Sequence, residues 1–274
     1  YEAKDKVLRL EKALYGLKQA PLQWNRRFTK ALKRRGLIQL NTDQCIFVNK
    51  DLTMILAIYV DDGFLIGLNE DEMNSLLRML QDEFEITINH NPDSYLGMSF
   101  EKKNGKIILH QRDYIKALLE ECKVENGKFQ PTPMIKNNNK NDNQVVEYKF
   151  NYRTLVGKLL YLANRSRPDI MYAVSFLSRH LENPTKHDID TVNRLLKYLN
   201  GTMDKEIQYD GNADFKKITA FCDADYANDE ETRKSTSGFV ILYGGPILWA
   251  SRKQALVATS TCEAEYIAAA DCVK

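Results

Sequence analysis

Apolar residues recur every four positions after Pro21, at Trp24, Phe28 and Leu32, and basic residues fill many of the positions between them. A stripe with this spacing lies along one side of a helix and faces a core. The pattern therefore predicts an amphipathic helix with a basic outer face. Gly36 follows it, and glycine is a residue type suited to the position just past a helix end.

Two short apolar runs, residues 54–59 and 64–66, flank a segment that contains Asp61 and Asp62. Runs of this length around turn-forming residues predict a β-hairpin with both carboxylates at its tip. An apolar run at residues 45–48 predicts another strand before it. Adjacent carboxylates repel each other, and burying either one without a partner is costly. We therefore expect a positive partner beside them.

The rest of the chain alternates between helical spacing and short strands. Helices are predicted over residues 70–84, 114–122, 152–163, 168–179, 188–199 and 263–272. Strands are predicted on both sides of Asn104 and Gly105, at residues 218–222, 239–243 and 247–250, and from Val257 onward. We expect the aromatic side chains of Trp24, Trp249 and Tyr266 to lie in the core.

The composition is that of a folded protein, with 43% hydrophobic and 28% charged residues over 274 positions. This length leaves room for two domains. The longest apolar stretch, residues 54–60, is far shorter than the roughly 18 to 20 residues of a membrane span, so we expect no membrane partner. Five cysteines without a CxxC pair argue against a disulfide framework or a zinc site. Because the first residue is Tyr1, we read the chain as a piece of a longer one.

Charge is distributed unevenly along the chain. Residues 1–36 hold eleven Lys or Arg against three Asp or Glu, a net charge of +8, whereas the whole chain carries +2. A segment of this charge can follow the phosphates of a nucleic acid. It can equally be the solvated face of a helix. Similarly, Asp61 and Asp62 suit a magnesium or manganese ion, and they also suit a solvated turn.

Ordered motifs along the whole chain decide between some of these alternatives. They are LYGLKQAPLQW at residues 14–24, YVDD at 59–62, YLGM at 95–98, QRDYIKALL at 111–119, YRTLVGKLLYLANRSRPDI at 152–170 and RLLKYLNGT at 194–202. In this order they resemble the reverse transcriptases of Ty1/copia-type LTR retrotransposons. AFCDADYANDEETRKSTSGFVILYGG, from Ala220, and STCEAEYIAAA, from Ser260, resemble the ribonuclease H region of the same Pol polyprotein.

The resemblance implies an α+β fold in which a partial reverse transcriptase palm and thumb precede a partial RNase H-like α/β domain. It places the palm and thumb at residues 1–133 and a helical connection at residues 150–216. The polar, asparagine-rich residues 134–149 form the linker between them. Residues 217–274 become the amino-terminal part of the RNase H-like domain. The family's first palm aspartate and its later RNase H carboxylates are expected outside these 274 residues.

For the polymerase, the resemblance implies that Asp61 and Asp62 bind Mg²⁺ or Mn²⁺, where two ions align a primer hydroxyl with a deoxynucleoside triphosphate. Tyr59 and Val60 match the positions beside the primer end. Lys18 and Gln19, in the GLKQAP turn, match positions near the nucleotide and the template. The solvated turn stays open as an alternative for Lys18.

For the ribonuclease H region, the resemblance implies a second two-metal carboxylate site, with catalytic and metal-binding roles for Asp223 and Glu265. Glu265 is chosen because EYIAA matches the helical glutamate of the family. Glu263 and Asp225 are expected to support these residues or to face solvent.

The implied partners are an RNA template, a DNA primer, an RNA/DNA hybrid, deoxynucleoside triphosphates and other segments of the Pol polyprotein. Such a protein is expected in the cytoplasm, within a virus-like particle, or in the nucleus. Because both metal sites are incomplete in these residues, we expect the isolated chain to be inactive. The alternatives are a transposon remnant that binds nucleic acid without catalysis and a decayed product with no biochemical role, against which the preserved carboxylates argue.

Overall fold

The computed structural model describes residues 9–124, 129–135 and 151–274, and the chain divides into two compact units, Tyr1–Pro92 and Asp93–Lys274. Most of the predicted linker, residues 134–149, therefore lies outside the described residues. Within the described ranges, no helix is long and apolar enough to cross a membrane.

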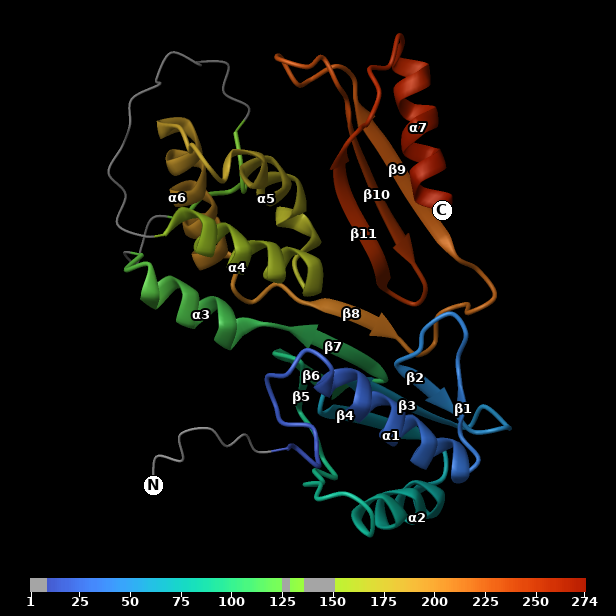
Figure 1. Cartoon of the computed structure of the whole chain (residues 1–274). Helices are drawn as coiled ribbons and strands as arrows, with labels where there is room; N and C mark the ends of the chain where they lie inside the picture. The colour runs from blue at the N-terminus through green and yellow to red at the C-terminus, as the bar shows by residue number, and fades with distance from the viewer. Residues whose placement is uncertain (1–8, 125–128, 136–150) are drawn as a thin grey trace, which may run out of the picture. The chain divides into compact units, whose positions relative to one another are not determined.

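The first unit is a small antiparallel sheet with two helices (Figure 1). Its strands, in the order in which they pair, are β1 (Ile38–Gln39), β2 (Ile46–Val48), β3 (Met54–Tyr59) and β4 (Asp62–Gly67). Its helices are α1 (Ala20–Arg34) and α2 (Glu70–Gln81). The helix, the hairpin and the strand before it that the sequence predicts are confirmed, and Gly36 has the positive φ, 82°, of a residue that ends a helix.

Both helices bury the same face of this sheet. Leu32 of α1 and Leu80 of α2 share one core cluster with Phe47 and Leu56 of the sheet. Along β3, buried and exposed residues alternate, so Leu56 faces the helices whereas Tyr59 belongs to the opposite face. Because of this alternation, Tyr59 at the end of β3 lies on the face of the sheet that the helices do not cover.

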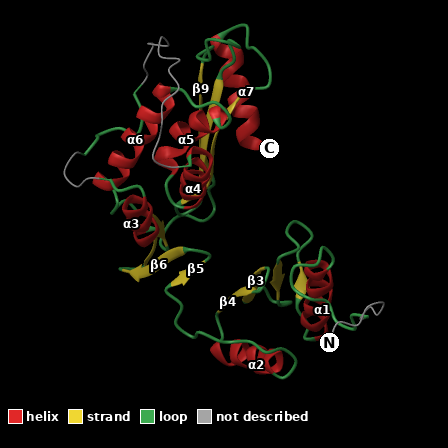
Figure 2. Cartoon of the chain, turned by 60° about the vertical axis from the view of Figure 1, so that its left-hand side comes forward, coloured by secondary structure: helices red, strands yellow, loops and turns green. Residues whose placement is uncertain are grey.

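The second unit contains two sheets and a group of helices (Figure 2). One sheet pairs β5 (Ser94–Tyr95), β6 (Met98–Lys103), β7 (Lys106–His110) and β8 (Ile207–Asp210). The helices are α3 (Arg112–Glu121), α4 (Tyr152–Arg165), α5 (Met171–Leu177) and α6 (Lys186–Gly201), with 3-10 turns at Pro168–Ile170 and Ser178–His180. These four α-helices bury one continuous apolar cluster, in which Leu159, Leu162 and Leu199 are fully buried.

The second sheet of this unit ends the chain, with β9 (Thr219–Asp225), β10 (Thr236–Leu242) and β11 (Pro246–Lys253) followed by α7 (Thr261–Val273). β10 lies in the middle and pairs with both neighbours. Trp249 of β11 packs against the helical cluster, and its indole N–H donates to the carbonyl oxygen of Ala163 at 2.8 Å.

An ion pair between the buried Arg167 and the partly exposed Asp169 lies between the helices of this unit. The guanidinium of Arg167, a residue that is 1% exposed, donates to both carboxylate oxygens of Asp169 at 2.9 and 2.8 Å and to the carbonyl oxygen of Thr202 at 3.0 Å. The hydroxyl of Tyr198 donates to the same carboxylate at 2.6 Å. The RSRPD stretch of the sequence therefore has a structural role that its pattern did not reveal.

Three sequence predictions differ from the structure. The helix predicted over residues 168–179 is a short α-helix between two 3-10 turns, the first of which begins at Pro168. No strand forms at Val257, because β11 ends at Lys253 and Ser260 caps α7 soon afterwards. Tyr266 is 78% exposed rather than in the core, since α7 turns its alanines toward the sheet.

Strand β8 is absent from the prediction, and it pairs with β7 in a register that joins Lys106 to Asp210. Because β7 pairs with β8, residues 93–124 belong to the same compact unit as helices α4, α5 and α6. The compact units thus divide at Pro92, inside the segment 1–133 that the resemblance implies for the palm and thumb.

Candidate functional site

The tip of the β3–β4 hairpin is a two-residue turn. Tyr59 pairs with Asp62, so Val60 and Asp61 make the turn between the strands. Val60 has φ +56°, in the left-handed region that a β-branched residue rarely adopts. A conformation of this kind costs about 1–3 kcal/mol and persists only where neighbouring structure holds it.

Trp24 supplies that support. Its indole N–H donates a hydrogen bond to the carbonyl oxygen of Val60, with a nitrogen to oxygen distance of 2.8 Å. The indole ring is stacked on Phe28 and meets Phe84 edge-on, with centroid distances of 5.2 and 5.5 Å. An aromatic cluster of the core thus holds the backbone of the tip.

Sequence reasoning assigned Trp24 to packing alone and missed this contact. The sequence indicates only that the N–H group of a half-buried tryptophan usually finds a hydrogen-bond acceptor, and it does not identify that acceptor.

Asp61 and Asp62 are both exposed at this tip. Because Asp62 pairs with Tyr59, it belongs to the face of the sheet that the helices leave uncovered. Within the described residues neither carboxylate has an ion-pair partner. Two unneutralised carboxylates with adjacent oxygen donors fit a hard divalent cation such as Mg²⁺ or Mn²⁺. No third His, Cys, Asp or Glu of the described ranges joins them to make a larger group of ligands.

The other residues predicted for this site lie around the same end of α1. Lys18 and Gln19 are exposed in the turn just before α1 begins at Ala20. Since Trp24 joins the first half of this helix to Val60, the turn and the tip belong to the same end of α1. The structure gives no contact between Lys18 or Gln19 and the two carboxylates, so their roles stay predictions.

The second pair of predicted residues lies in the other unit. Asp223, on β9, lines a pocket together with Asp225, Tyr172 of α5 and Trp249 of β11. The pairing register places Asp223 opposite Gly238, and the neighbouring pair, Ala224 and Ser237, belongs to the other face of the sheet.

Helix α7 covers that other face. The side-chain amide of Gln254 donates both to the hydroxyl of Ser237, at 3.0 Å, and to the carbonyl oxygen of Ala264 in α7, at 2.9 Å. Glu265 is exposed on α7 and does not line the pocket of Asp223. To share an ion, the two carboxylates would have to reach past the edge strand β9, and their joint role stays a prediction.

Glu263, which lies two residues before Glu265 on α7, forms hydrogen bonds at the start of its own helix. Its carboxylate accepts from the backbone N–H and the hydroxyl of Thr259, both at 2.6 Å, and these hydrogen bonds lower the pKa of Glu263. Glu263 therefore stabilises the start of the helix. Asp225 likewise accepts from Asn228 and from the backbone N–H of Thr236.

Comparison with known proteins assigns the family. Residues 1–136 match the family model "Reverse transcriptase (RNA-dependent DNA polymerase)". The chain is 36% identical, over 98% of its length, to the "Retrovirus-related Pol polyprotein from transposon TNT 1-94" of Nicotiana tabacum, and it spans 21% of that polyprotein. It is 30% identical to the "Putative transposon Ty5-1 protein YCL074W" of Saccharomyces cerevisiae, over 98% of this chain and 89% of that protein.

The "Retrovirus-related Pol polyprotein from transposon RE1" of Arabidopsis thaliana is 34% identical over 95% of the chain, which spans 18% of that polyprotein. The chain thus covers about a fifth of the length of both Pol polyproteins. No solved structure matches it. The hairpin with its YVDD tip lies within the matched reverse transcriptase residues. The chain therefore belongs to the Ty1/copia-type Pol polyproteins of transposons and carries part of their reverse transcriptase.

Proposed function

We propose that this chain provides the metal-binding hairpin of an RNA-directed DNA polymerase that copies transposon RNA into DNA. The observation that carries the proposal is the tip itself, where Asp61 and Asp62 stand exposed on a strained turn that Trp24 holds. Strain that the surrounding structure maintains is typical of functional sites.

Each residue of the tip then has a distinct role. Asp61 and Asp62 would hold Mg²⁺ or Mn²⁺, which when bound supplies charge stabilisation for phosphoryl transfer. Tyr59 and Val60 would lie beside the primer end, and Lys18 and Gln19 near the nucleotide and the template. Trp24 keeps the backbone of Val60 in place, so it orients both carboxylates without contacting the substrate.

The proposal extends to ribonuclease H activity on the RNA strand of the hybrid, with Asp223 and Glu265 as metal ligands. The succession of three antiparallel strands and a helix, with Asp223 exposed on the first strand, supports this assignment. Because α7 covers the face opposite to Asp223, the two ligands would have to approach around β9.

Metal binding at the tip can be measured with the two tryptophans of the chain as reporters. In a ¹⁵N–¹H spectrum each indole N–H gives one signal, and Trp24→Phe assigns them. Mn²⁺ held by Asp61 and Asp62 is expected to broaden the signal of Trp24, because its N–H donates to Val60 beside both carboxylates. The combined substitution Asp61→Asn and Asp62→Asn should abolish this broadening.

The control for this titration is Asp51→Asn, which removes an exposed carboxylate from the turn between β2 and β3 of the same unit. It should leave the broadening of Trp24 unchanged. The metal site is contradicted if Mn²⁺ does not broaden the Trp24 signal, or if it broadens that signal equally in the variant with Asp61→Asn and Asp62→Asn. The signal of Trp249 reports separately on the pocket of Asp223.

We also propose that the 274-residue chain does not extend a primer on its own. Two-metal catalysis needs more ligands than the pair at the tip, and the described residues bring no third ligand to it. In a primer-extension assay with an RNA template, Mg²⁺ and deoxynucleoside triphosphates, we expect no product above the level without protein. Magnesium-dependent extension that Asp61→Asn abolishes would overturn this expectation.

The alternative function is nucleic-acid binding without catalysis. It predicts duplex binding that falls steeply with salt and ignores Mg²⁺, together with no effect of Mn²⁺ on Trp24. The Mn²⁺ titration therefore separates the two functions.

A further inference from the structure

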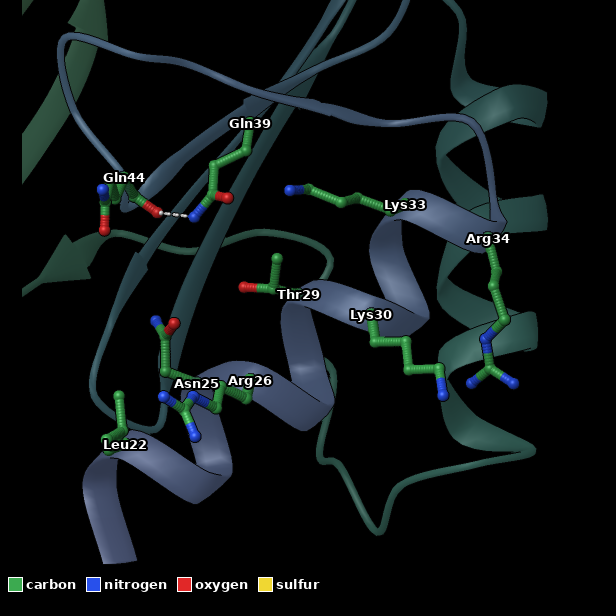
Figure 3. Close-up of a pocket in the computed structure, with 9 residues that line it drawn as sticks. All are labelled: Leu22, Asn25, Arg26, Thr29, Lys30, Lys33, Arg34, Gln39 and Gln44. Atoms are coloured by element: carbon green, nitrogen blue, oxygen red, sulfur yellow. Dashed lines mark hydrogen bonds between the residues drawn. The ribbon is translucent and has the colours of Figure 1, made fainter. Parts of the chain in front are cut away.

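A groove runs along α1 on the side that faces away from the core (Figure 3). Arg26, Thr29 and Lys33 line it from the helix; Arg26 and Lys33 are exposed, and the half-buried Thr29 lies at the edge of the face that carries Leu32. Its other wall carries Gln39 and Gln44. The groove encloses about 650 Å³, and its lining residues are Leu22, Asn25, Arg26, Thr29, Lys30, Lys33, Arg34, Gln39 and Gln44.

The positive charge of this groove is mostly unneutralised. Arg34 forms an ion pair with Glu83 at 2.7 Å. By contrast, Arg26, Lys30 and Lys33 have no acidic partner among the residues that the structure describes, and all three are exposed. Cations that the protein itself does not pair are available to an anionic ligand.

The neutral side chains of the groove add hydrogen-bonding groups. Gln39 donates from its side-chain amide to the carbonyl oxygen of Gln44 at 2.8 Å, which ties down this wall. The hydroxyl oxygen of Thr29 is buried and has no hydrogen-bond partner. Figure 3 shows Thr29 and Lys33 directed toward the gap between α1 and Gln39. A buried hydroxyl without a partner is costly, and an ordered water beneath the surface of the groove would satisfy it.

We propose that this groove binds the phosphodiester backbone of a nucleic acid. Arg and Lys together with Thr, Asn and Gln are the side chains that contact phosphate and sugar oxygens. No aromatic side chain lines the groove to stack on bases, so we expect binding to be mainly to the backbone and independent of sequence. Arg26 and Lys33 are seven residues apart, about 10 Å along a helix, so both can contact phosphates of the same strand.

This surface is separate from the hairpin tip. The groove lies on the side of the sheet that carries α1, where Gln39 of β1 forms part of its wall, whereas Asp62 belongs to the opposite face of that sheet. A nucleic acid in the groove would therefore be held away from the carboxylates, as a second stretch of template or product. The inference rests on the proposed function only in taking nucleic acid as the ligand.

The test is a binding titration of the full chain in EDTA, so that no metal contributes. A fluorescein-labelled RNA/DNA duplex is followed by anisotropy over a series of salt concentrations. The variant Arg26→Gln with Lys33→Gln removes two groove cations and keeps helix propensity. We expect the slope of log affinity against log salt to become shallower by about two.

The matched control is Lys102→Gln with Lys103→Gln, which removes the same charge from exposed positions on β6 of the other unit. It should keep the slope of the unsubstituted chain. Equal slopes for both double variants, or no change in the groove variant, would overturn the inference. Displacement of the duplex by poly-glutamate as effectively as by unlabelled duplex would instead identify an acidic polypeptide as the ligand and overturn it as well.

Failure here is distinguishable from failure of the polymerase proposal. The groove variant retains Asp61 and Asp62, so Mn²⁺ should still broaden the Trp24 signal in it. Asp61→Asn with Asp62→Asn should conversely keep the salt dependence of duplex binding in EDTA.

Discussion

Replacing Asp169 with alanine is expected to destabilise the second unit by about 3–4 kcal/mol, the lower part of the range for removing the partner of a buried charge, because Arg167 is buried whereas Asp169 is partly exposed and Thr202 still accepts from the guanidinium. Tyr198 also loses its hydrogen-bond acceptor in this variant. Urea unfolding followed by the fluorescence of Trp249, in a Trp24→Phe background, measures the change in this unit. Asp190→Ala is the control, since it removes an exposed carboxylate from α6 and should change stability by less than about 0.5 kcal/mol.

The same ion pair makes stability depend on acid. Burial alone would raise the pKa of Asp169, but hydrogen bonds from Arg167 and Tyr198 and the charges of Arg167 and Lys205 bring it below its ordinary value of 3.8. A carboxylate with a lowered pKa stabilises the fold above its unfolded pKa, and this contribution is lost as the pH falls through the folded value. The unsubstituted unit should therefore lose stability below pH 3.8 more steeply than Asp169→Ala does. If the free energy of unfolding falls equally steeply with acid in the unsubstituted unit and in Asp169→Ala, the pKa of Asp169 does not differ between the folded and unfolded states.

Removing the indole of Trp24 is expected to have the second-largest effect. Trp24→Ala should destabilise the first unit by about 3 kcal/mol, the lower end for such a truncation, because the ring is only half-buried. Trp24→Phe keeps a ring against Phe28 and Phe84 and loses only the hydrogen bond to Val60, which is worth about 1 kcal/mol. Urea unfolding followed by tyrosine fluorescence or circular dichroism gives both values.

Both variants should also release the hairpin tip. Without the indole N–H, the positive φ of Val60 loses a stabilising contact, so the amide hydrogens of Tyr59 and Asp62, which pair across the hairpin beside the turn, should exchange faster in both. Trp249→Phe is the matched control, because it removes the same kind of hydrogen bond, to Ala163, from the other unit. Unchanged exchange at the tip in Trp24→Phe would mean that the hydrogen bond does not position the carboxylates.

Several parts of the site could be predicted from the sequence because their causes are local. Residues 54–67 hold two apolar runs and the turn between them within fourteen positions, so the hairpin and the place of Asp61 and Asp62 follow from the pattern alone. The helix behind them follows from the spacing of Trp24, Phe28 and Leu32. The basic outer face was visible too, although the pattern left its phosphate-binding and solvated interpretations open.

Contacts between distant segments could not be predicted in this way. The hydrogen bond from Trp24 to Val60 joins positions 36 residues apart, and β8 pairs with β7 across about a hundred residues. In both cases the local sequence is compatible with several partners. The partner is chosen by how the chain packs, which a single sequence does not display.

The sequence by itself determined the family, the hairpin with its two carboxylates and most of the helices, because periodicity, turn chemistry and ordered motifs are properties of short segments. Only the tertiary structure decided that the buried Arg167 pairs with Asp169, that Trp24 holds the tip and that α7 covers the face opposite to Asp223. Each of these depends on which faces are buried against each other, and burial is settled by the packing of the whole unit.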